Sequence, residues 1–225
     1  MCTCHPGRKE GNMYEKFHEL PVEKQTCIIN AAMEVFSKNE YKQANTDDIA
    51  ARAGISKGSL FYYFHNKRDL YLYLYDYTAN VMKSQILDKD FWKITDLFER
   101  IRYGALCKVR ILKKNPHILD FCVRCFYSKE EAVSSQLNSM NTELTDNAAE
   151  SYFAGIDCSK FKDGVSAQKV YQMMNWMSDG YIHSKRMKED ALDLEQMMKE
   201  FEEWMEMLRT MMYKEEYLHE CNRDT

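Results

Sequence analysis

The amino-acid sequence predicts an all-α protein with an N-terminal three-helix helix-turn-helix domain and a C-terminal helical bundle. Glycine and proline are scarce, at 8 and 3 of 225 residues, whereas a protein built from many short strands needs frequent turns. Apolar residues instead recur at helical spacing along most of the chain. Two short helical segments separated by a glycine-containing turn lie between about residues 44 and 63, and this arrangement is typical of a helix-turn-helix.

The charge of the chain is unevenly distributed, although its composition is that of an ordinary globular protein, with 45% hydrophobic and 29% charged residues. The formal net charge is −4. The segment 49–68 nevertheless contains no Asp or Glu, and its basic residues are Arg52, Lys57, Lys67 and Arg68. A local basic patch on an acidic protein can bind a polyanion at one face.

The sequence contains no signal for a membrane or for secretion. No run approaches the roughly 18 apolar residues that a membrane span needs, and the first twelve residues have no hydrophobic core region. We therefore expect a cytoplasmic protein whose eight cysteines are mostly reduced thiols. Residues 1–20 share little character with the rest of the chain, and we expect a tail there that need not be ordered.

The predicted helix-turn-helix domain occupies residues 21–81. Its first helix, over 21–37, is indicated by a helical stripe of Ile28, Ile29, Ala32, Val35 and Phe36. The second helix can be capped by Asn45 or Thr46, and the acidic residues after the cap suit its positive end. Gly54 then ends this helix, as a helix C-terminus prefers.

The third and fourth helices come directly after this turn. Ser56 can cap a helix that begins at Lys57 and ends near Phe64. The next segment, 69–78, alternates as a strand would, but its leucines and tyrosines also fit one helical face. Asn66 as a cap with Asp69 three residues later favours a helix over 66–84.

Residues 82–225 are predicted to form a second, helical domain. Expected helices cover about 91–114, 116–126, 129–154, 166–188 and 193–218, and 155–166 is expected to be a loop. The last two helices carry long apolar stripes. These stripes comprise Val170, Met173, Met174, Met177 and Tyr181 in the first helix, and Leu194, Met197, Met198, Phe201, Trp204, Met205, Leu208, Met211 and Met212 in the second.

The stretch NTDDIAARAGISKGSLFYYFHNKRDL, residues 45–70, closely resembles the tetracycline-repressor (TetR) family of regulators. The matching features are IA, the run AG-I-S-K-G-S-L, the aromatic FYYF, and NK before DL. The preceding AAMEVFSKNEY, residues 31–41, also matches. The specific resemblance covers about 21–81, and beyond it the likeness is one of architecture. It implies a transcription regulator rather than an enzyme, with no cofactor.

The resemblance assigns DNA contacts to particular residues. Base reading in the major groove falls to Lys57, Gly58 and Ser59, in the first turn of the second helix of the motif. Phosphate contacts fall to Thr46, Tyr62, Tyr63 and Lys67. The family more often has Tyr where this chain has Phe61, whose ring lacks a hydroxyl donor. Leu60 and Phe64 are expected in the core of the domain.

The resemblance also implies a homodimer that binds a palindromic double-stranded DNA operator and a small-molecule effector. The two last helices, about 166–188 and 193–218, would form the dimer interface, and effector binding would release a repressor from its operator. Effector-pocket candidates are the larger side chains between the fourth helix and 188. They are Tyr103, Phe121, Phe126, Tyr152, Trp176, Met177 and His183.

Two other interpretations start from the residues alone. A thiol- or metal-responsive regulator of the same fold could use Cys122 and Cys125, whose spacing places two thiols on one helical face. Cys2, Cys4 and His5 also look ligand-like, but a structural zinc site has four ligands in paired motifs, and there is no second CxxC. A helical enzyme would need a catalytic motif, and none of the common phosphate-loop, metalloprotease or hydrolase motifs is present.

Overall fold

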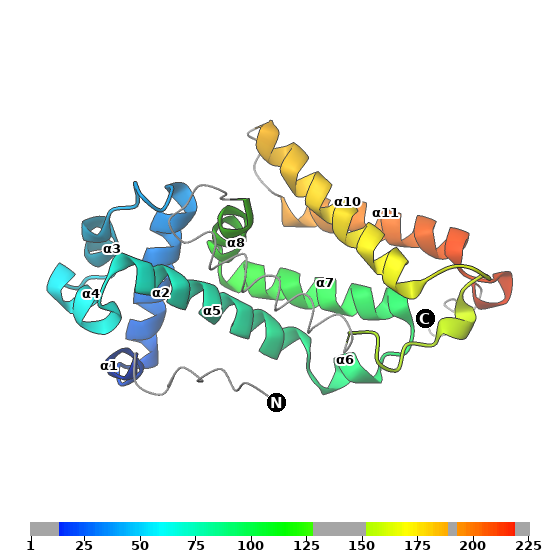
Figure 1. Cartoon of the computed structure of the whole chain (residues 1–225), viewed down its shortest axis with the longest axis horizontal. Helices are drawn as coiled ribbons and strands as arrows, with labels where there is room; N and C mark the ends of the chain where they lie inside the picture. Colours follow the sequence, from blue (N-terminus) through cyan, green and yellow to red (C-terminus); the bar gives the residue numbers. More distant parts are fainter. Residues whose placement is uncertain (1–13, 128–151, 189–192, 219–225) are drawn as a thin grey trace, which may run out of the picture. The chain divides into compact units, whose positions relative to one another are not determined.

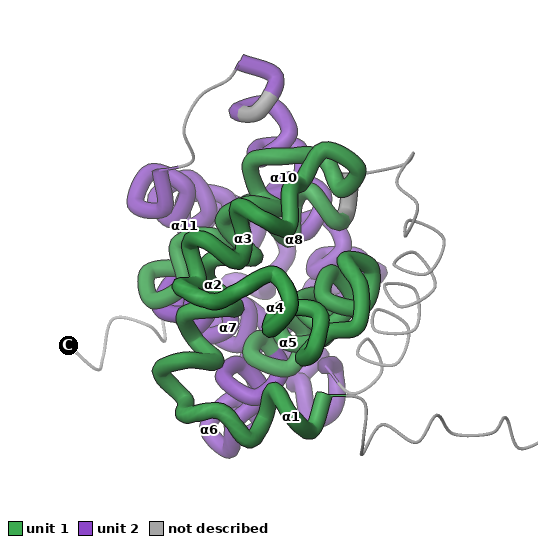
Figure 2. Tube along the Cα trace, turned by 90° about the vertical axis from the view of Figure 1, so that its left-hand side faces the viewer, with its two compact units in different colours: residues 1–82, 112–144 green, residues 83–111, 145–225 purple. Residues whose placement is uncertain are grey.

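The computed structural model describes residues 14–127, 152–188 and 193–218 of the chain (Figure 1). The described residues form helices and connecting loops, with one isolated β-bridge between Phe161 and Tyr213, so the predicted all-α fold is confirmed. They separate into two compact units, one of residues 1–82 and 112–144, the other of 83–111 and 145–225 (Figure 2). None of the described helices is long and apolar enough to cross a membrane.

The first unit contains the predicted helix-turn-helix. Its helices are α1 (Glu15–His18), α2 (Val22–Lys38), α3 (Thr46–Arg52), α4 (Lys57–Phe64), α5 (Lys67–Ile86, whose last turn enters the second unit) and α8 (Ile118–Tyr127). The helices expected over 21–37, from 45 or 46, over 57–64 and over 66–84 therefore lie where the sequence predicted them. The apparent strand at 69–78 is helical, and its leucines and all of its tyrosines except Tyr77 are buried within α5.

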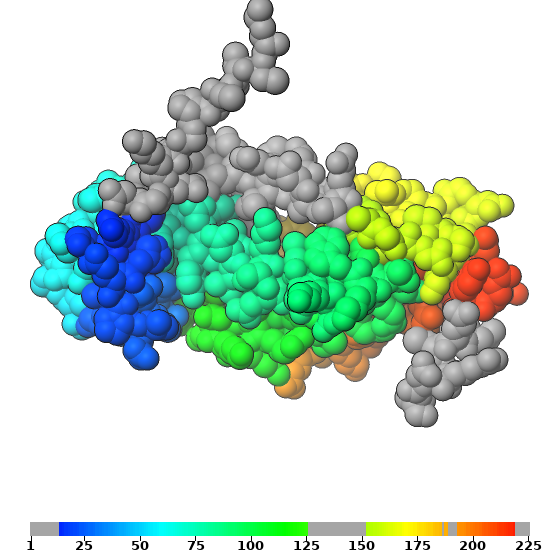
Figure 3. All heavy atoms as spheres, turned by 90° about the horizontal axis from the view of Figure 1, so that it is seen from below, coloured from blue at the N-terminus to red at the C-terminus, as the bar shows by residue number. Residues whose placement is uncertain are grey.

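Helix α1 lies inside the range predicted to be a tail, so that prediction was wrong for residues 15–18. Residues 1–13 lie outside the described part of the chain. Phe17 is fully buried, and its ring lies 4.7 Å from that of Phe64 and 5.3 Å from that of Tyr73. Figure 3 shows the start of the described chain and α4 side by side on one face of this unit. The ring contacts of Phe17 therefore make α1 part of the domain.

Helix α8 belongs to the first unit, although the sequence boundary at 81 placed it in the C-terminal domain. It packs against α2, and the ring of Phe121 contacts those of Phe36 and Tyr71 at 6.5 and 5.2 Å. The Arg124 guanidinium donates to the Ser37 carbonyl at 3.1 Å. The sequence shows that α8 has an apolar face, but it does not show which helix covers that face.

The second unit is built from helices of the remaining chain. They are α6 (Lys89–Lys93), α7 (Leu97–Lys114, whose last turn belongs to the first unit), η1 (Cys158–Lys160), α10 (Ala167–Met187), α11 (Leu194–Met212) and η2 (Glu215–Tyr217). The core combines residues from α7, α10 and α11 with two loop aromatics. It comprises Leu97, Phe98, Ile101, Phe161, Ala167, Val170, Met174, Met205, Leu208 and Tyr213.

The single helix predicted over 91–114 is two helices. The break follows from two aspartates that act as N-caps: Asp88 accepts from the amides of Asp90 and Phe91, and Asp96 accepts from those of Phe98 and Glu99. Each cap satisfies amides that have no partner within the helix. The helix expected over 129–154 falls almost wholly outside the described residues.

Arg100 fixes the loop between α6 and α7 in a way that the sequence did not reveal. Its side chain is fully buried and donates to the carbonyls of Ile94, Tyr152 and Ala154. Burial lowers the pKa of the guanidinium from its ordinary value, but an arginine stays charged. Hydrogen bonds to carbonyls therefore compensate the buried charge, and they join two segments more than fifty residues apart in the sequence.

Candidate nucleic-acid interface

Helices α3 and α4 form a helix-turn-helix whose ends are capped by side chains. The Asn45 carbonyl oxygen accepts from the Asp47 amide at 2.9 Å, and the Ser56 hydroxyl accepts from the Ser59 amide at 3.0 Å. Gly54 has a φ of +60°, a conformation that residues with a Cβ adopt with strain. Lys24 of α2 braces this turn by donating to the Gly54 carbonyl at 3.2 Å. The two side-chain caps and the glycine turn therefore lie where the sequence predicted a helix-turn-helix.

The apolar run of α4 divides between a buried and an outward side, as predicted. Leu60 and Phe64 are 1% and 0% exposed, so they hold the helix against the rest of the domain. Lys57 and Gly58 in the first turn are exposed. A Cβ added at Gly58 would meet only the Ser56 hydroxyl, at 3.6 Å, so the backbone there can be approached closely by a ligand.

The three residues predicted to contact phosphate near α4 lie in different environments. Tyr62 is 60% exposed. Tyr63 is half-buried, and its ring lies 6.2 Å from that of Phe17. Lys67 donates to the carbonyls of Lys42 and Ala44, both at 3.1 Å. Thr46, predicted for the same role, is half-buried at the start of α3.

Two cations of the acid-free segment 49–68 form ion pairs with acids from outside it. Lys57 Nζ lies 2.9 Å from Asp47 Oδ2, and Arg52 Nη1 lies 2.9 Å from Glu34 Oε1. Glu34 also binds Lys38, and the Lys38 hydrogen bond is the main reason that its carboxyl pKa lies below the ordinary value. Arg68 also has a partner. The basic segment is thus partly neutralised within the free domain.

The junction between α4 and α5 has strained backbone that the sequence analysis missed. His65 has φ +55° and ψ −49°, and the Asn66 amide donates to the Phe64 carbonyl at 2.5 Å. This is a γ-turn with positive φ, a rare and strained conformation for a residue with a side chain. His65 is the one described residue other than glycine with a positive φ.

The seven effector-pocket candidates are divided between the two units. Phe121 lies in the core of the first unit, whereas Trp176 and His183 of α10 are exposed. In the second unit the Tyr103 hydroxyl donates to Asp88 at 2.6 Å, which raises the pKa of Tyr103 to about 12. Tyr152 packs on Tyr171 at 4.4 Å, Met177 is half-buried, and the side chain of Phe126 lies outside the described set. The assignment of these residues to an effector pocket remains a prediction.

Cys122 and Cys125 are located in the first unit. Burial raises the pKa of the Cys122 thiol to about 12, and the buried Cys125 thiol donates to the Tyr71 hydroxyl at 3.3 Å. A reactive or metal-binding cysteine needs the thiolate, which this environment disfavours. Among the described residues no cluster of three His, Cys, Asp or Glu could hold a metal ion. Cys2, Cys4 and His5 lie outside those residues.

Comparison with known proteins places this geometry in a family. Residues 28–74 match the family of bacterial regulatory proteins called the tetR family. The fatty acid metabolism regulator protein of Bacillus subtilis is 42% identical over 48 residues, which are 21% of this chain and 25% of that protein. The matched segment therefore spans about a quarter of that curated relative.

Solved structures extend the likeness to most of the chain. The fatty acid degradation regulator FadR from Bacillus halodurans is 20% identical, with a TM-score of 0.64, and the alignment covers 80% of this chain and 96% of that one. SmeT, the repressor of a multidrug efflux pump of Stenotrophomonas maltophilia, is 13% identical, with a TM-score of 0.63 and coverage of 88% and 93%.

These likenesses show the fold of the chain. The chain has the two-domain helical fold of bacterial transcription regulators, and its matched relatives are regulators rather than enzymes, as the sequence predicted. Residues 28–74, which include the helix-turn-helix, are similar to the tetR family of bacterial regulatory proteins.

Proposed function

We propose that the protein is a sequence-specific DNA-binding transcription regulator that inserts the first turn of α4 into the major groove. The observation that carries this proposal is the division of α4 between a fully buried side and an exposed, capped first turn. A recognition helix has this form, because its N-terminal residues meet base edges. Lys57 can donate to guanine acceptors, and Ser59 can bond to either base.

The residues around α4 would contact the DNA backbone. Tyr62 is well placed as a phosphate donor, because most of its side chain is exposed. Tyr63 has less freedom, since α1 covers part of its ring. Thr46 would act at the N-terminus of α3, where helix amides favour phosphate. Lys67 would have to exchange two carbonyl acceptors for a phosphate. We therefore assign it a second role, which is to stabilise the fold by binding these carbonyls.

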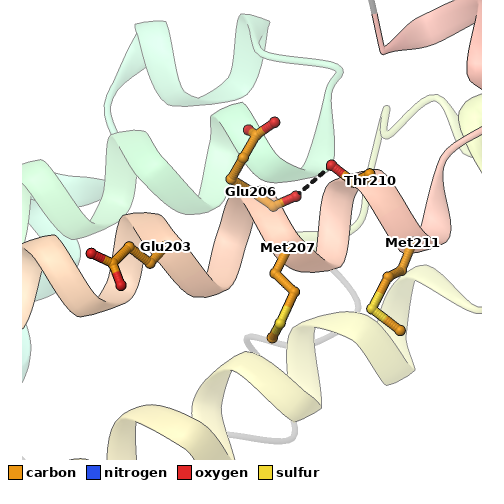
Figure 4. A pocket seen from close by; sticks show the side chains of 5 residues that line it. All are labelled: Glu203, Glu206, Met207, Thr210 and Met211. Atoms are coloured by element: carbon orange, nitrogen blue, oxygen red, sulfur yellow. Dashed lines mark hydrogen bonds between the residues drawn. The ribbon is translucent and has the colours of Figure 1, made fainter.

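We propose that the protein acts as a homodimer through α10 and α11. Most of the apolar stripe predicted on α11 faces the core of its own unit, but Met211 of that stripe is 58% exposed, and Met207, outside the stripe, is 51% exposed. Figure 4 shows their side chains extending from the same side of the helix, and with Glu203, Glu206 and Thr210 they line a shallow hollow. An exposed apolar strip of this kind can form part of a protein interface.

A two-fold dimer predicts a palindromic operator, with half-sites about one turn of DNA apart. We further propose repression that a small-molecule effector relieves. Helix α5 could transmit the signal, because it begins directly after the recognition helix and its chain continues into the second unit. The coupling free energy required is typically about 1–3 kcal/mol.

Selection of random-sequence DNA duplexes by the purified full chain tests the proposal. We expect enrichment of one palindromic sequence, bound with an affinity that falls steeply as salt rises. Fatty acids are the first effectors to add to the complex, because two similar proteins are described as regulators of fatty-acid metabolism or degradation. Enrichment of no sequence at several salt concentrations would show that the chain is not a sequence-specific regulator.

A further inference from the structure

We propose that Asp47 competes with DNA for the Lys57 ammonium, so that the contribution of Lys57 to DNA binding depends on the base sequence. This inference rests on the proposed function. Lys57 is the cation in the first turn of α4, and its ammonium forms an ion pair of 2.9 Å with Asp47 in the first turn of α3. The two side chains retain 51% and 58% of their exposure. Solvent and ligands can therefore reach the pair, and DNA can compete for the lysine.

Asp47 occupies a place where an acidic residue opposes DNA binding. The N-terminus of α3 would attract phosphate through its free amides, but the Asp47 amide is already bound to the Asn45 side chain, and the carboxylate repels phosphate. The same carboxylate offers Lys57 an oxygen acceptor, as a phosphate or a guanine does. In the free protein the Asp47 carboxylate thus accepts from the Lys57 ammonium in place of a DNA acceptor.

The exchange of partners differs between two kinds of DNA. On unrelated DNA, Lys57 would exchange the Asp47 carboxylate for a phosphate. Because one anionic partner replaces another, the exchange adds little binding free energy. On the operator Lys57 would gain base-edge acceptors in addition. An exposed ion pair is worth at most about 1 kcal/mol, so it is strong enough to hold Lys57 against the first exchange and weak enough to permit the second. Asp47 therefore lowers binding to unrelated sequences more than binding to the operator.

The chain provides a matched control at the adjacent residue. Asp48 is also an exposed acidic residue in the first turn of α3, so Asp48→Asn removes the same charge from the same helix end without releasing Lys57. The probes are the duplex enriched by the wild-type chain and a shuffled duplex of the same length and composition. Affinities for both are measured across a salt series.

We expect Asp47→Asn to bind the shuffled duplex about two- to fivefold more tightly than Asp48→Asn does. The affinity for the enriched duplex should differ less, so the discrimination ratio falls. The salt dependence on the shuffled duplex should steepen by about 0.9 in the logarithmic slope, because Lys57 becomes an additional phosphate contact. In a Lys57→Ala background, Asp47→Asn and Asp48→Asn should behave alike.

The same experiment can overturn the inference. Equal effects of Asp47→Asn and Asp48→Asn in the wild-type background would mean that Asp47 acts through its charge alone. A difference that persists in the Lys57→Ala background would mean that it does not act through Lys57. Either result leaves the proposed function intact, since the wild-type chain would still discriminate between the two duplexes. If the wild-type chain enriches no duplex, the proposed function and this inference both fail.

Discussion

Lys67 shows how folding decides what a basic residue can do. In the sequence it is one of four cations in a segment without acidic residues, which favours a phosphate contact. In the structure its ammonium binds two backbone carbonyls and lies 4.8 Å from the centre of the Tyr41 ring. Lysine donors can satisfy carbonyls and phosphates equally well. Its position beside α4 therefore supports a role in fixing the recognition helix as well as a role in binding DNA.

Lys67→Ala separates these two roles. We expect the free energy of unfolding to fall by about 1 kcal/mol, because the carbonyls of Lys42 and Ala44 lose a charged donor. We also expect affinity for all DNA sequences to fall alike and the salt slope to decrease by about one. Urea denaturation and DNA binding over a salt series measure the two effects. Lys42→Ala, which removes an exposed lysine side chain nearby, is the control, and equal stability of the two variants would exclude the stabilising role.

His65 provides a second prediction at the scale of one residue. A residue with a Cβ in strained backbone typically costs about 1–3 kcal/mol, and glycine adopts positive φ without this cost, although it loses more entropy on folding. We therefore expect His65→Gly to raise the free energy of unfolding by about 1 kcal/mol in urea denaturation. His65→Ala keeps the Cβ and should give no such gain. Similar stabilities for these two variants would mean that the turn is not strained.

Helices were the features that the sequence predicted best, and the helices and helix breaks that it missed have physical causes. The caps at Asn45 and Ser56 were recognisable because a capping residue precedes each apolar segment. The caps at Asp88 and Asp96 were missed because apolar spacing continues across the break that they cause. Helix α1 was missed because one fully buried phenylalanine holds it, and a single aromatic residue produces no periodicity in the sequence.

Removal of the Phe17 ring tests whether α1 is part of the DNA-binding domain. Phe17→Ala should lower the free energy of unfolding by about 3–5 kcal/mol, the usual cost of truncating a buried phenylalanine. It should also weaken DNA binding, because the lost ring contacts Phe64 of the recognition helix. Phe17→Leu should recover much of the loss. Glu15→Ala, an exposed change in the same helix, is the control. A Phe17→Ala protein as stable as the control would mean that α1 does not support the domain.

The assignment of helices to the two units was less predictable than the helices themselves. The first unit is divided from the second at residue 82, but it also includes residues 112–144, which the sequence assigned to the C-terminal domain. The return of α8 to the first unit depends on which apolar faces meet, and a single sequence contains no such information. For the same reason the sequence predicted DNA-facing residues but did not reveal Asp47 and Glu34 as the partners of Lys57 and Arg52, since these acids lie outside the basic segment.

The oligomeric state is the prediction that concerns the whole molecule. Met207 and Met211 lie one turn apart on α11 and expose apolar side chains between acidic residues. If a second copy covers them, a carboxylate at each position would be buried without a partner, and buried unpaired charge is strongly unfavourable. The double variant Met207→Glu with Met211→Glu should therefore be a folded monomer, with half the mass of the wild-type particle in analytical ultracentrifugation. It should bind a palindromic duplex much more weakly, because each monomer reads one half-site.

Val22→Glu is the control, because it places the same charge at an apolar side chain that is 71% exposed in α2, and this variant should remain dimeric. A double variant that keeps the wild-type mass would exclude this strip of α11 from the interface.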